Sequence, residues 1–255
     1  MAPDAALEAL KTRAADQGGE EAGEIPLPER LERERNILLV WAREEGLTFP
    51  AKAYLSYELT THGEHHVFYE IILERYFKVT HGLNPDAGGF ALTVDTDFRV
   101  GKKTQCYIGV PFVREATPFE YLSRLQLFNR TFTDFIDFAG VIDEPGKVAI
   151  VTSQPFVPGE ASTDEEVAAF MATRGFGVVP GVVAGRRDSV SFFRERDNVA
   201  VFDTHGENFL TFGPKIAPID ALIIVADDDL AAFLSLAPAK RREEIGIWTS
   251  LISDF

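Results

Sequence analysis

The feature that most constrains the fold is a series of short apolar runs between residues 199 and 220. Three such runs follow one another: Val199-Ala-Val-Phe202, Phe209-Leu-Thr-Phe212 and Ile216-Ala-Pro-Ile219. Short runs of β-branched and aromatic residues bounded by Gly, Pro and Asp are typical of strands. The sequence therefore predicts a buried strand followed by a β-hairpin, with Asp203, Asn208 and Asp220 presented at one edge.

Asp203, Asn208 and Asp220 carry oxygen atoms that suit phosphoryl transfer. This chemistry needs one carboxylate to orient or deprotonate the acceptor, and further oxygen ligands to hold magnesium against the nucleotide phosphates. Ordinary turn chemistry explains any one of these residues alone, but the ordered trio on a strand, loop and strand favours a functional interpretation. We therefore predict Asp203 and Asn208 as catalytic residues, and Asn208 and Asp220 as magnesium ligands.

Composition narrows the class of protein. The net charge of −15 opposes a general affinity for nucleic acid or anionic membranes, since such binding draws on basic patches. A single cysteine, Cys106, excludes a disulfide framework within the chain and suits a reducing compartment. The sequence shows no signal peptide and no apolar run long enough to span a bilayer, so we expect a cytoplasmic protein.

The 255 residues are enough for one large or two small domains. Residues 1–28 are rich in Gly and Glu toward their end and predict a mobile or loosely packed arm. We expect an amino-terminal lobe over 29–152, a hinge over 153–160 and a carboxyl-terminal lobe over 161–255. The predicted fold class is α+β.

Local patterns place the expected elements. Strands of an antiparallel sheet are predicted at 52–61, 65–72 and 73–80, an added hairpin at 90–94 and 106–110, and a buried strand at 148–152. Thr117-Pro-Phe-Glu120 is a capping box that opens a helix through about residue 132, and Thr163-Asp-Glu-Glu166 opens another through 174. Residues 227–255 carry a helical pattern.

Lys78 is the lysine whose position suits the phosphate side of such a site. It alternates with aromatic and β-branched neighbours on a predicted strand, although an edge-strand lysine that discourages aggregation is the alternative explanation. Glu120 is its expected acidic partner, with Glu64 as the competing acid. A glycine-rich phosphate loop is missing, since the expected region offers Gly63 alone.

The histidines are weaker candidates for functional residues than Asp203, Asn208 and Asp220. His62, His65 and His66 lie close in sequence, but adjacent strand residues point to opposite faces, which disfavours a zinc site. His205 is expected to brace the loop or orient Asp203 rather than to transfer protons.

The chain resembles the kinase-like domain family found in polyvalent proteins of phages and conjugative elements. The resemblance runs from about Tyr76 to Ile223, and the loop from Asp203 to Asn208 also looks like the catalytic loop of aminoglycoside phosphotransferases. Six short segments carry it in order: Phe77-Lys-Val-Thr-His81, Ala116-Thr-Pro-Phe-Glu-Tyr-Leu122, Leu127-Phe-Asn129, Thr152-Ser-Gln-Pro-Phe156, Val201-Phe-Asp-Thr-His-Gly-Glu-Asn208 and Pro218-Ile-Asp220.

The resemblance implies a bilobal protein-kinase-like fold. Its amino-terminal lobe would be an antiparallel sheet with a helix, and its mainly helical carboxyl-terminal lobe would hold a catalytic β-hairpin. ATP and Mg²⁺ are the implied cofactors. Lys78 would contact the nucleotide phosphates with Glu120 as its partner, and Gln154 and Phe156 would lie at the adenine-side linker.

Three functions remain open on the sequence. The first is an ATP- and magnesium-dependent phosphotransferase acting on a hydroxyl of a protein or a small molecule. The second is a catalytically inactive pseudokinase that binds a nucleotide or a partner, which the missing glycine loop favours. The third is a metal-dependent hydrolase using Asp203, His205 and Asp220, which lacks a second histidine at ligand spacing.

Overall fold

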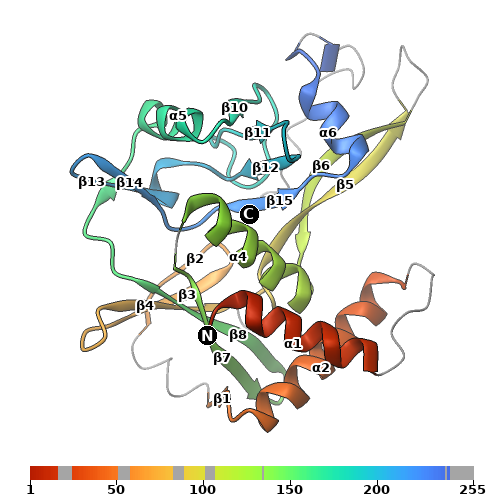
Figure 1. Ribbon diagram of the computed structural model, residues 1–255, viewed down its shortest axis with the longest axis vertical. Coiled ribbons are helices and arrows are strands. Elements are labelled where there is room, and N and C mark those ends of the chain that lie inside the picture. The colour runs from red at the N-terminus through yellow and green to blue at the C-terminus, as the bar shows by residue number, and fades with distance from the viewer. Residues whose placement is uncertain are drawn as a thin grey trace. The chain divides into compact units, whose positions relative to one another are not determined.

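The described part of the chain divides into two compact units (Figure 1). The computed structural model describes residues 1–16, 25–50, 58–82, 89–100, 107–133, 135–238 and 240–241, and only the backbone of 58–62, 98–100 and 107–108. Unit 1 comprises Met1–Leu92 and Glu115–Phe156, and unit 2 comprises Thr93–Arg114 and Val157–Phe255. The second crossing between the units, after Phe156, falls inside the predicted hinge.

Unit 1 is built on a six-stranded sheet in the order β1-β7-β8-β4-β3-β2. β1 pairs with β7 in parallel, and all the other neighbours are antiparallel. The strands are β1 (Thr48–Phe49), β2 (Glu58–His62), β3 (His65–Glu70), β4 (Arg75–Thr80), β7 (Asp137–Glu144) and β8 (Lys147–Pro155). The predicted strands are therefore present as β2, β3, β4 and β8, except that residues 71–74 form a turn, and residues 51–57 lie outside the described residues.

The two faces of this sheet differ in chemistry. One face carries an apolar cluster formed by Phe68, Val79, Ile142, Ala149 and Val151. On the opposite face, His65 is hydrogen-bonded to Tyr121 of helix α4 (Pro118–Phe132), with 3.0 Å between Nε2 and the phenol oxygen. Lys78 shares this second face, since its directly opposed neighbours are Val67 on β3 and Thr152 on β8.

Helix α4 begins where the sequence predicts. The Thr117 hydroxyl accepts the Glu120 N–H at 3.3 Å, and a Glu120 carboxylate oxygen accepts the Thr117 N–H at 2.9 Å, which completes the capping box. Tyr121, Leu125 and Phe128 are buried on the side of the helix that faces the unit. The same local chemistry starts α5 (Asp164–Thr173) in unit 2, at Thr163 and Glu166.

The expected amino-terminal arm is partly a folded helix. Residues Pro3–Asp16 form α1, which packs on α4 and on α2 (Leu27–Glu44). Ala6, Leu7 and Leu10 are completely buried. The prediction of a mobile or loosely packed arm is therefore wrong for residues 3–16, because apolar residues at helical spacing give this short segment a face that unit 1 covers. Residues 17–24 lie outside the described residues.

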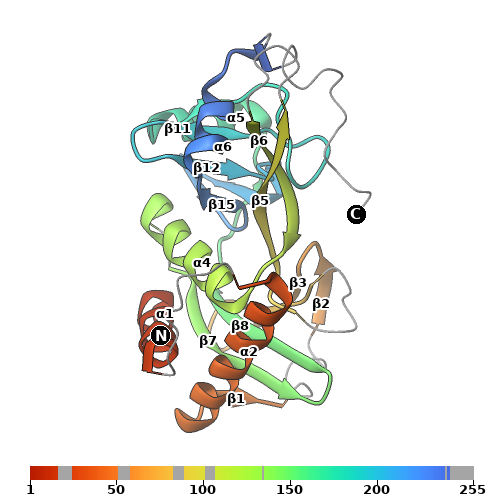
Figure 2. The same cartoon turned by 90° about the vertical axis from the view of Figure 1, so that its right-hand side faces the viewer.

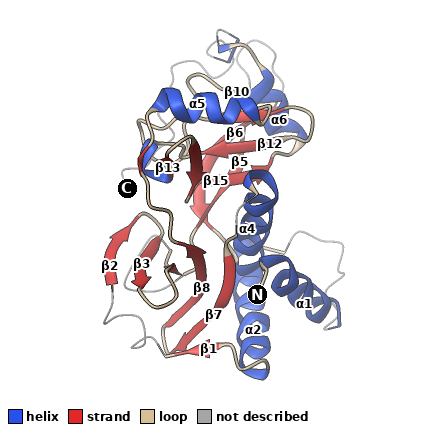
Figure 3. Cartoon of the chain, turned by 60° about the vertical axis from the view of Figure 1, so that its left-hand side comes forward, coloured by secondary structure: helices blue, strands red, loops and turns tan. Residues whose placement is uncertain are grey.

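Unit 2 contains several small sheets. A four-stranded sheet has the order β10-β11-β12-β15, a three-stranded sheet has the order β14-β13-β9, and β5 pairs with β6. The strands are β5 (Leu92–Val100), β6 (Tyr107–Glu115), β9 (Glu160–Ala161), β10 (Gly177–Val178), β11 (Phe192–Arg194), β12 (Val199–Phe202), β13 (Phe209–Phe212), β14 (Lys215–Pro218) and β15 (Leu222–Val225). With α5 and α6 (Asp228–Ser235), these make the chain an α+β protein (Figure 3).

Two predictions about unit 2 need correction. A mainly helical second lobe was expected, but strands outnumber helices among its described residues, because short β-branched and aromatic runs such as Val199–Phe202 form buried strands here. The added hairpin was assigned to the first lobe, yet β5 and β6 group with unit 2 (Figure 2). A Cβ atom on Gly109 would lie 3.0 Å from Leu230 N, so β6 packs closely on the start of α6. Residues 101–106 of the hairpin lie outside the described residues.

No helix among the described residues has both the length and the apolar character needed to cross a membrane.

Candidate active site

Asp203 stands at the end of a completely buried strand. All four residues of β12 are buried, between β11 and β15. Asp203 itself leaves the strand in the left-handed region, with φ of 57°, and its side chain keeps a quarter of its surface exposed. Asp adopts this conformation more readily than most residues, although a left-handed residue still carries strain that surrounding contacts must hold. Strand β12 thus delivers a carboxylate to the surface of unit 2.

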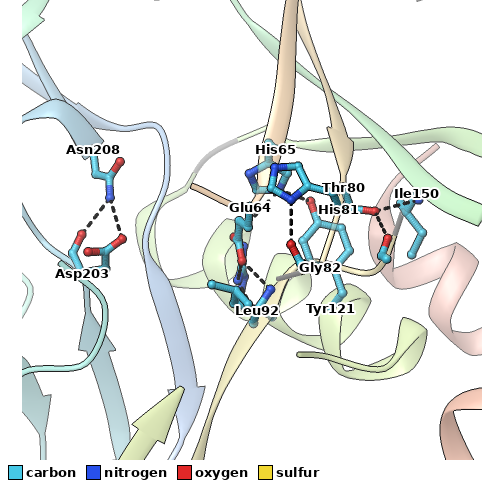
Figure 4. A network of polar contacts seen from close by, with 12 residues as sticks. Glu64, His65, Thr80, His81, Gly82, Leu92, Tyr121, Ile150, Asp203 and Asn208 are labelled. Carbon is cyan, nitrogen blue, oxygen red and sulfur yellow. Dashed lines mark hydrogen bonds and ion pairs between the residues drawn. The ribbon is translucent and has the colours of Figure 1, made fainter. Parts of the chain in front are cut away.

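Asn208 contacts Asp203 (Figure 4) and also the segment that carries Asp220. Its Nδ2 donates to the Asp203 carbonyl oxygen at 2.8 Å and lies 3.3 Å from the Asp203 Oδ2 atom. The main-chain carbonyl oxygen of Asn208 accepts the Ile219 N–H at 2.8 Å and the Asp220 N–H at 3.4 Å. The predicted trio is therefore brought together, and Asn208 connects its two acidic members.

The predicted hairpin explains why Asp220 comes back to this place. β13 and β14 pair in antiparallel register from Phe209 with Pro218 to Phe212 with Lys215. β15 then pairs with β12, with Leu222 opposite Phe202. Since Asp203 follows Phe202 directly and Asp220 comes two residues before Leu222, the antiparallel register sets both carboxylates at the same end of the strand pair.

The loop between Asp203 and Asn208 fits closely against the start of α5. A Cβ atom on Gly206 would lie 2.0 Å from the Ser162 carbonyl oxygen, so no larger residue fits without movement. The Ser162 N–H in turn donates to the Phe209 carbonyl oxygen at 2.8 Å and to the Gly206 carbonyl oxygen at 3.2 Å. His205 Nε2 lies 3.9 Å from Asp203 Oδ1, beyond hydrogen-bond distance, and its Nδ1 is buried.

Lys78 lies on an interior strand of unit 1. β4 runs between β3 and β8, so the edge-strand explanation for this lysine is wrong. Lys78 is 9% exposed, and Thr152 opposite it is buried as well. A lysine is rarely buried to this extent without a partner or a function, because its charge is costly to remove from water.

The two acids expected to partner Lys78 each contact an arginine. Glu120 pairs with Arg30 of α2 at 2.5 Å while also completing the capping box. Glu64, in the tight turn between β2 and β3, forms a two-contact ion pair with Arg124 of α4, including a 3.0 Å contact from Arg124 Nη1 to Glu64 Oε2. Pairing of either acid with Lys78 stays a prediction.

Gln154 and Phe156 lie at the end of β8, next to the boundary of unit 1. Gln154 is buried and stands opposite Tyr76 on β4. The Phe156 N–H donates to the Glu74 carbonyl oxygen at 2.9 Å. The residue is 41% exposed, and its ring centroid lies 5.3 Å from that of Tyr69. Their predicted place at an adenine-side linker stays a prediction.

The histidines of unit 1 divide between the two sides of β3, as expected for adjacent strand residues. His65 contacts Tyr121, whereas the His66 ring lies 4.9 Å from that of His81. His81 is buried, which lowers its pKa, and its Nδ1 lies 2.7 Å from the Gly82 carbonyl oxygen. The side chain of His62 is outside the described residues.

Sequence reasoning missed two residues that hold α4. Arg124 stands between Tyr121 and Leu125 on the buried side of that helix, and an arginine among core positions is the signal that could have marked it. On α2, Glu34 accepts the Phe119 N–H at 2.9 Å. Burial raises the pKa of Glu34, and the hydrogen bonds from Thr117 and Phe119 oppose that change.

Comparison with known proteins shows which family the part of the chain around this loop is similar to. Residues 110–227 match the family described as "Serine/Threonine/Tyrosine Kinase found in polyvalent proteins". Over these residues the family resemblance predicted from the sequence is confirmed. The matched range contains Glu120, Asp203, Asn208 and Asp220 but begins after Lys78. No curated protein and no solved structure matches the chain.

Proposed function

We propose that the chain is an ATP- and magnesium-dependent phosphotransferase that acts on a hydroxyl group of a protein or a small molecule. The match of residues 110–227 to a kinase family indicates phosphotransferase activity. The observation that carries the finer proposal is Asn208, which joins Asp203 to the backbone of Asp220 inside the matched range.

The donor set around Asn208 fits magnesium. Because Nδ2 of Asn208 is turned toward Asp203, its amide oxygen Oδ1 is the atom left for a cation. Carboxylate and amide oxygens are the ligands that Mg²⁺ prefers. Asn208 and Asp220 would hold the ion, and when bound it would neutralise charge on the nucleotide phosphates.

Asp203 has the position and exposure expected of the residue that handles the acceptor. Its carboxylate would accept the proton of the acceptor hydroxyl as that oxygen bonds to the γ-phosphorus and the bond from phosphorus to the ADP oxygen breaks. Its fixed geometry supports this role, since a base must be held within hydrogen-bond reach of the proton it takes. The acidic composition of the chain favours a basic or cationic acceptor.

The order of elements in unit 1 supports a kinase-like amino-terminal lobe. In protein kinases the phosphate-contacting lysine lies on the third strand and its acidic partner lies on the following helix. Here β2, β3 and β4 are consecutive antiparallel strands, Lys78 is on the third of them, and α4 is the next helix of unit 1. We therefore extend the proposal to a bilobal kinase-like arrangement in which Lys78 binds the phosphates and the chain around Gln154 and Phe156 receives the adenine.

One observation favours the alternative function, a pseudokinase that binds a nucleotide or a partner without catalysis. The turn where a glycine-rich phosphate loop is expected is a tight connection of Gly63 and Glu64, since His62 pairs directly with His65. Glu64 is buried against Arg124, so this turn offers a carboxylate where phosphate recognition calls for backbone N–H groups.

The test is transfer of labelled γ-phosphate from ATP to a panel of protein and small-molecule acceptors, with the wild type and Asp203→Asn. Asparagine tolerates the left-handed conformation of Asp203 but cannot accept the proton, so the rate should fall by roughly two to four orders of magnitude. Asp227→Asn is the matched control, because asparagine caps α6 as well as aspartate does. Equal rates in both variants would remove Asp203 from the mechanism, and ATP binding without transfer would favour the pseudokinase.

A further inference from the structure

The segment Gly181–Ser191, here called the bracing loop, packs against Asp203. At Gly185 its backbone lies so close to the Asp203 carboxylate that no side chain fits between them. Gly185 has φ of +99°, a conformation that residues with a side chain rarely adopt. A Cβ atom at this position would lie 2.6 Å from both Cγ and Oδ1 of Asp203. The backbone of Gly185 therefore lies directly against the carboxylate, and glycine is required for both conformation and space.

The next residue supplies a hydrogen bond to the same carboxylate. The Arg186 N–H donates to Asp203 Oδ1 at 2.8 Å. On the other oxygen, Asn208 Nδ2 lies 3.3 Å from Oδ2. The two oxygens of Asp203 are thus held by donors from two separate segments, which restricts rotation of the carboxyl group about its side-chain bonds.

Buried hydroxyl groups fix the shape of the bracing loop. Ser189 donates to the Arg186 carbonyl oxygen through its hydroxyl at 2.6 Å and its N–H at 3.0 Å. The Ser191 hydroxyl donates to the Val182 carbonyl oxygen at 2.7 Å. The hydroxyl of Thr204, which follows Asp203 directly and is buried, donates to the Val190 carbonyl oxygen. The loop is therefore tied both to itself and to the chain that carries the candidate base.

The side chain of Arg186 contributes less to holding Asp203 than its main-chain N–H does. Its guanidinium lies 2.8 Å from Glu207 Oε2 and 2.8 Å from Asp188 Oδ1, and these acids raise its pKa. All three side chains are about half exposed or more, and ion pairs in water contribute little because solvent screens them. The main-chain N–H, by contrast, reaches the carboxylate itself.

We propose that Gly185 and the main-chain N–H of Arg186 position the Asp203 carboxylate for catalysis. This inference rests on the proposed function, in which Asp203 takes the proton of the acceptor. Gly185 and Arg186 are positioning residues, since they act through Asp203 and hold its side chain in one orientation. The bracing loop precedes the Asp203 loop in sequence, and its role comes from the contacts of the fold rather than from a catalytic motif.

The central variant is Gly185→Ala, with Gly146→Ala as its matched control. Both glycines have positive φ, but a Cβ at Gly146 meets nothing within 4 Å, so the control reproduces the backbone strain without the contact. Displacing the carboxylate by a fraction of an ångström should lower kcat by about ten- to a hundredfold. KM for ATP should stay unchanged, because Asn208 and Asp220 are left in place.

Hydrogen exchange of the Arg186 amide, followed by NMR, tests the contact apart from turnover. The amide should be protected in the wild type and in Gly146→Ala, and should exchange faster in Gly185→Ala. A second pair of variants covers the case in which Gly185→Ala does not fold: Thr204→Val should lower kcat, and Thr204→Ser, which keeps the hydroxyl, should restore it.

The outcomes separate this inference from the function on which it rests. A kcat of Gly185→Ala equal to that of Gly146→Ala would overturn the positioning role, as would an equal loss of kcat and ATP affinity. An unprotected Arg186 amide in the wild type would overturn it without any turnover measurement. Absence of phosphoryl transfer in a wild type whose Arg186 amide is protected would overturn the proposed function instead. If Thr204→Val and Thr204→Ser have equal kcat, the link between the two loops does not position Asp203.

Discussion

The candidate site residues of the two units are held in different ways. In unit 2, Asp203, Asn208 and Asp220 lie within one short stretch of chain and contact one another through side-chain and backbone hydrogen bonds. In unit 1, Glu64 contacts Arg124, which is 60 positions away. The unit 2 residues are partly exposed, whereas the ion pair of unit 1 is buried.

This difference separates residues that face a ligand from residues that support a fold. Partial exposure on a braced loop leaves oxygen atoms available for a cation and an acceptor. A buried ion pair has lost its contact with water, so each charge depends on the other. We therefore expect substitutions in unit 2 to change activity more than stability, and substitutions at the ion pair of unit 1 to do the opposite. Lys78 is the test of that division, because it is buried but predicted to act on the nucleotide.

The largest effect on stability is expected from Arg124→Met. Removing this guanidinium leaves the Glu64 carboxylate buried without its partner, which should lower the free energy of unfolding by about 3–5 kcal/mol. Adding Glu64→Gln to Arg124→Met should recover part of the loss. Lys11→Met, which breaks an exposed pair with Glu8, is the control and should cost no more than about 0.5 kcal/mol. Denaturant unfolding measures all of these, and equal small losses would show that the buried pair does not support the fold.

Lys78→Met comes next, and its effect should be on catalysis. The methionine side chain matches the lysine stem in length and volume, so the packing around β4 should be kept and turnover should fall more than stability. Loss of a cation that acts on the phosphates should lower the transfer rate by roughly a hundredfold. Lys147→Met, at the start of β8, is the control. A variant that loses stability but keeps its turnover would make Lys78 a structural residue like Arg124.

Asn208→Ala and Asn129→Ala compare one residue type in the two units. Each amide donates to a main-chain carbonyl oxygen at 2.8 Å, that of Asp203 for Asn208 and that of Ile136 for Asn129. Both variants should lose about 1 kcal/mol of unfolding free energy. Only Asn208→Ala should weaken magnesium-dependent ATP binding, by about tenfold or ~1.4 kcal/mol. Calorimetry checks this, and equal affinities in the two variants would contradict the magnesium role.

The smallest effect concerns pH and Glu34. Because burial raises its pKa above the ordinary 4.5, the folded state binds the Glu34 proton more tightly than the unfolded state does. This contribution to the free energy of unfolding is fully present below pH 4.5. It is lost as the pH rises through the pKa of Glu34 in the folded state. Glu34→Gln keeps a neutral acceptor for the Phe119 N–H, so it should be more stable than the wild type at pH 7, with a smaller difference near pH 4. Thermal unfolding at both pH values measures this, and a difference that does not change with pH would contradict it.

Local chemistry made part of this structure predictable from the sequence. The capping boxes at Thr117 and Thr163 need contacts within four residues, and both form as predicted. The hairpin after Asp203 is likewise set by its own turn residues, Gly213 and Pro214. The trio of the candidate site is therefore brought together largely by sequence that lies between its members.

Contacts between distant segments could not be predicted in this way. The ion pair of Glu64 with Arg124 and the hydrogen bond from the Phe119 N–H to Glu34 each join elements from separate parts of the chain. The burial of α1 depends on surfaces of α2 and α4 that its own residues do not reveal, because a short helix alone is marginal in water. The bracing of Asp203 by Gly185 belongs to the same class, since it depends on one glycine lying beside one carboxylate in the fold.

The central claim is tested most directly by calorimetric titration of ATP, with and without magnesium, into the wild type and Asp220→Asn. The wild type should bind ATP with an affinity that magnesium increases, and Asp220→Asn should lose the magnesium dependence. Absence of ATP binding by the wild type under both conditions would contradict the phosphotransferase site and leave a module that binds a partner.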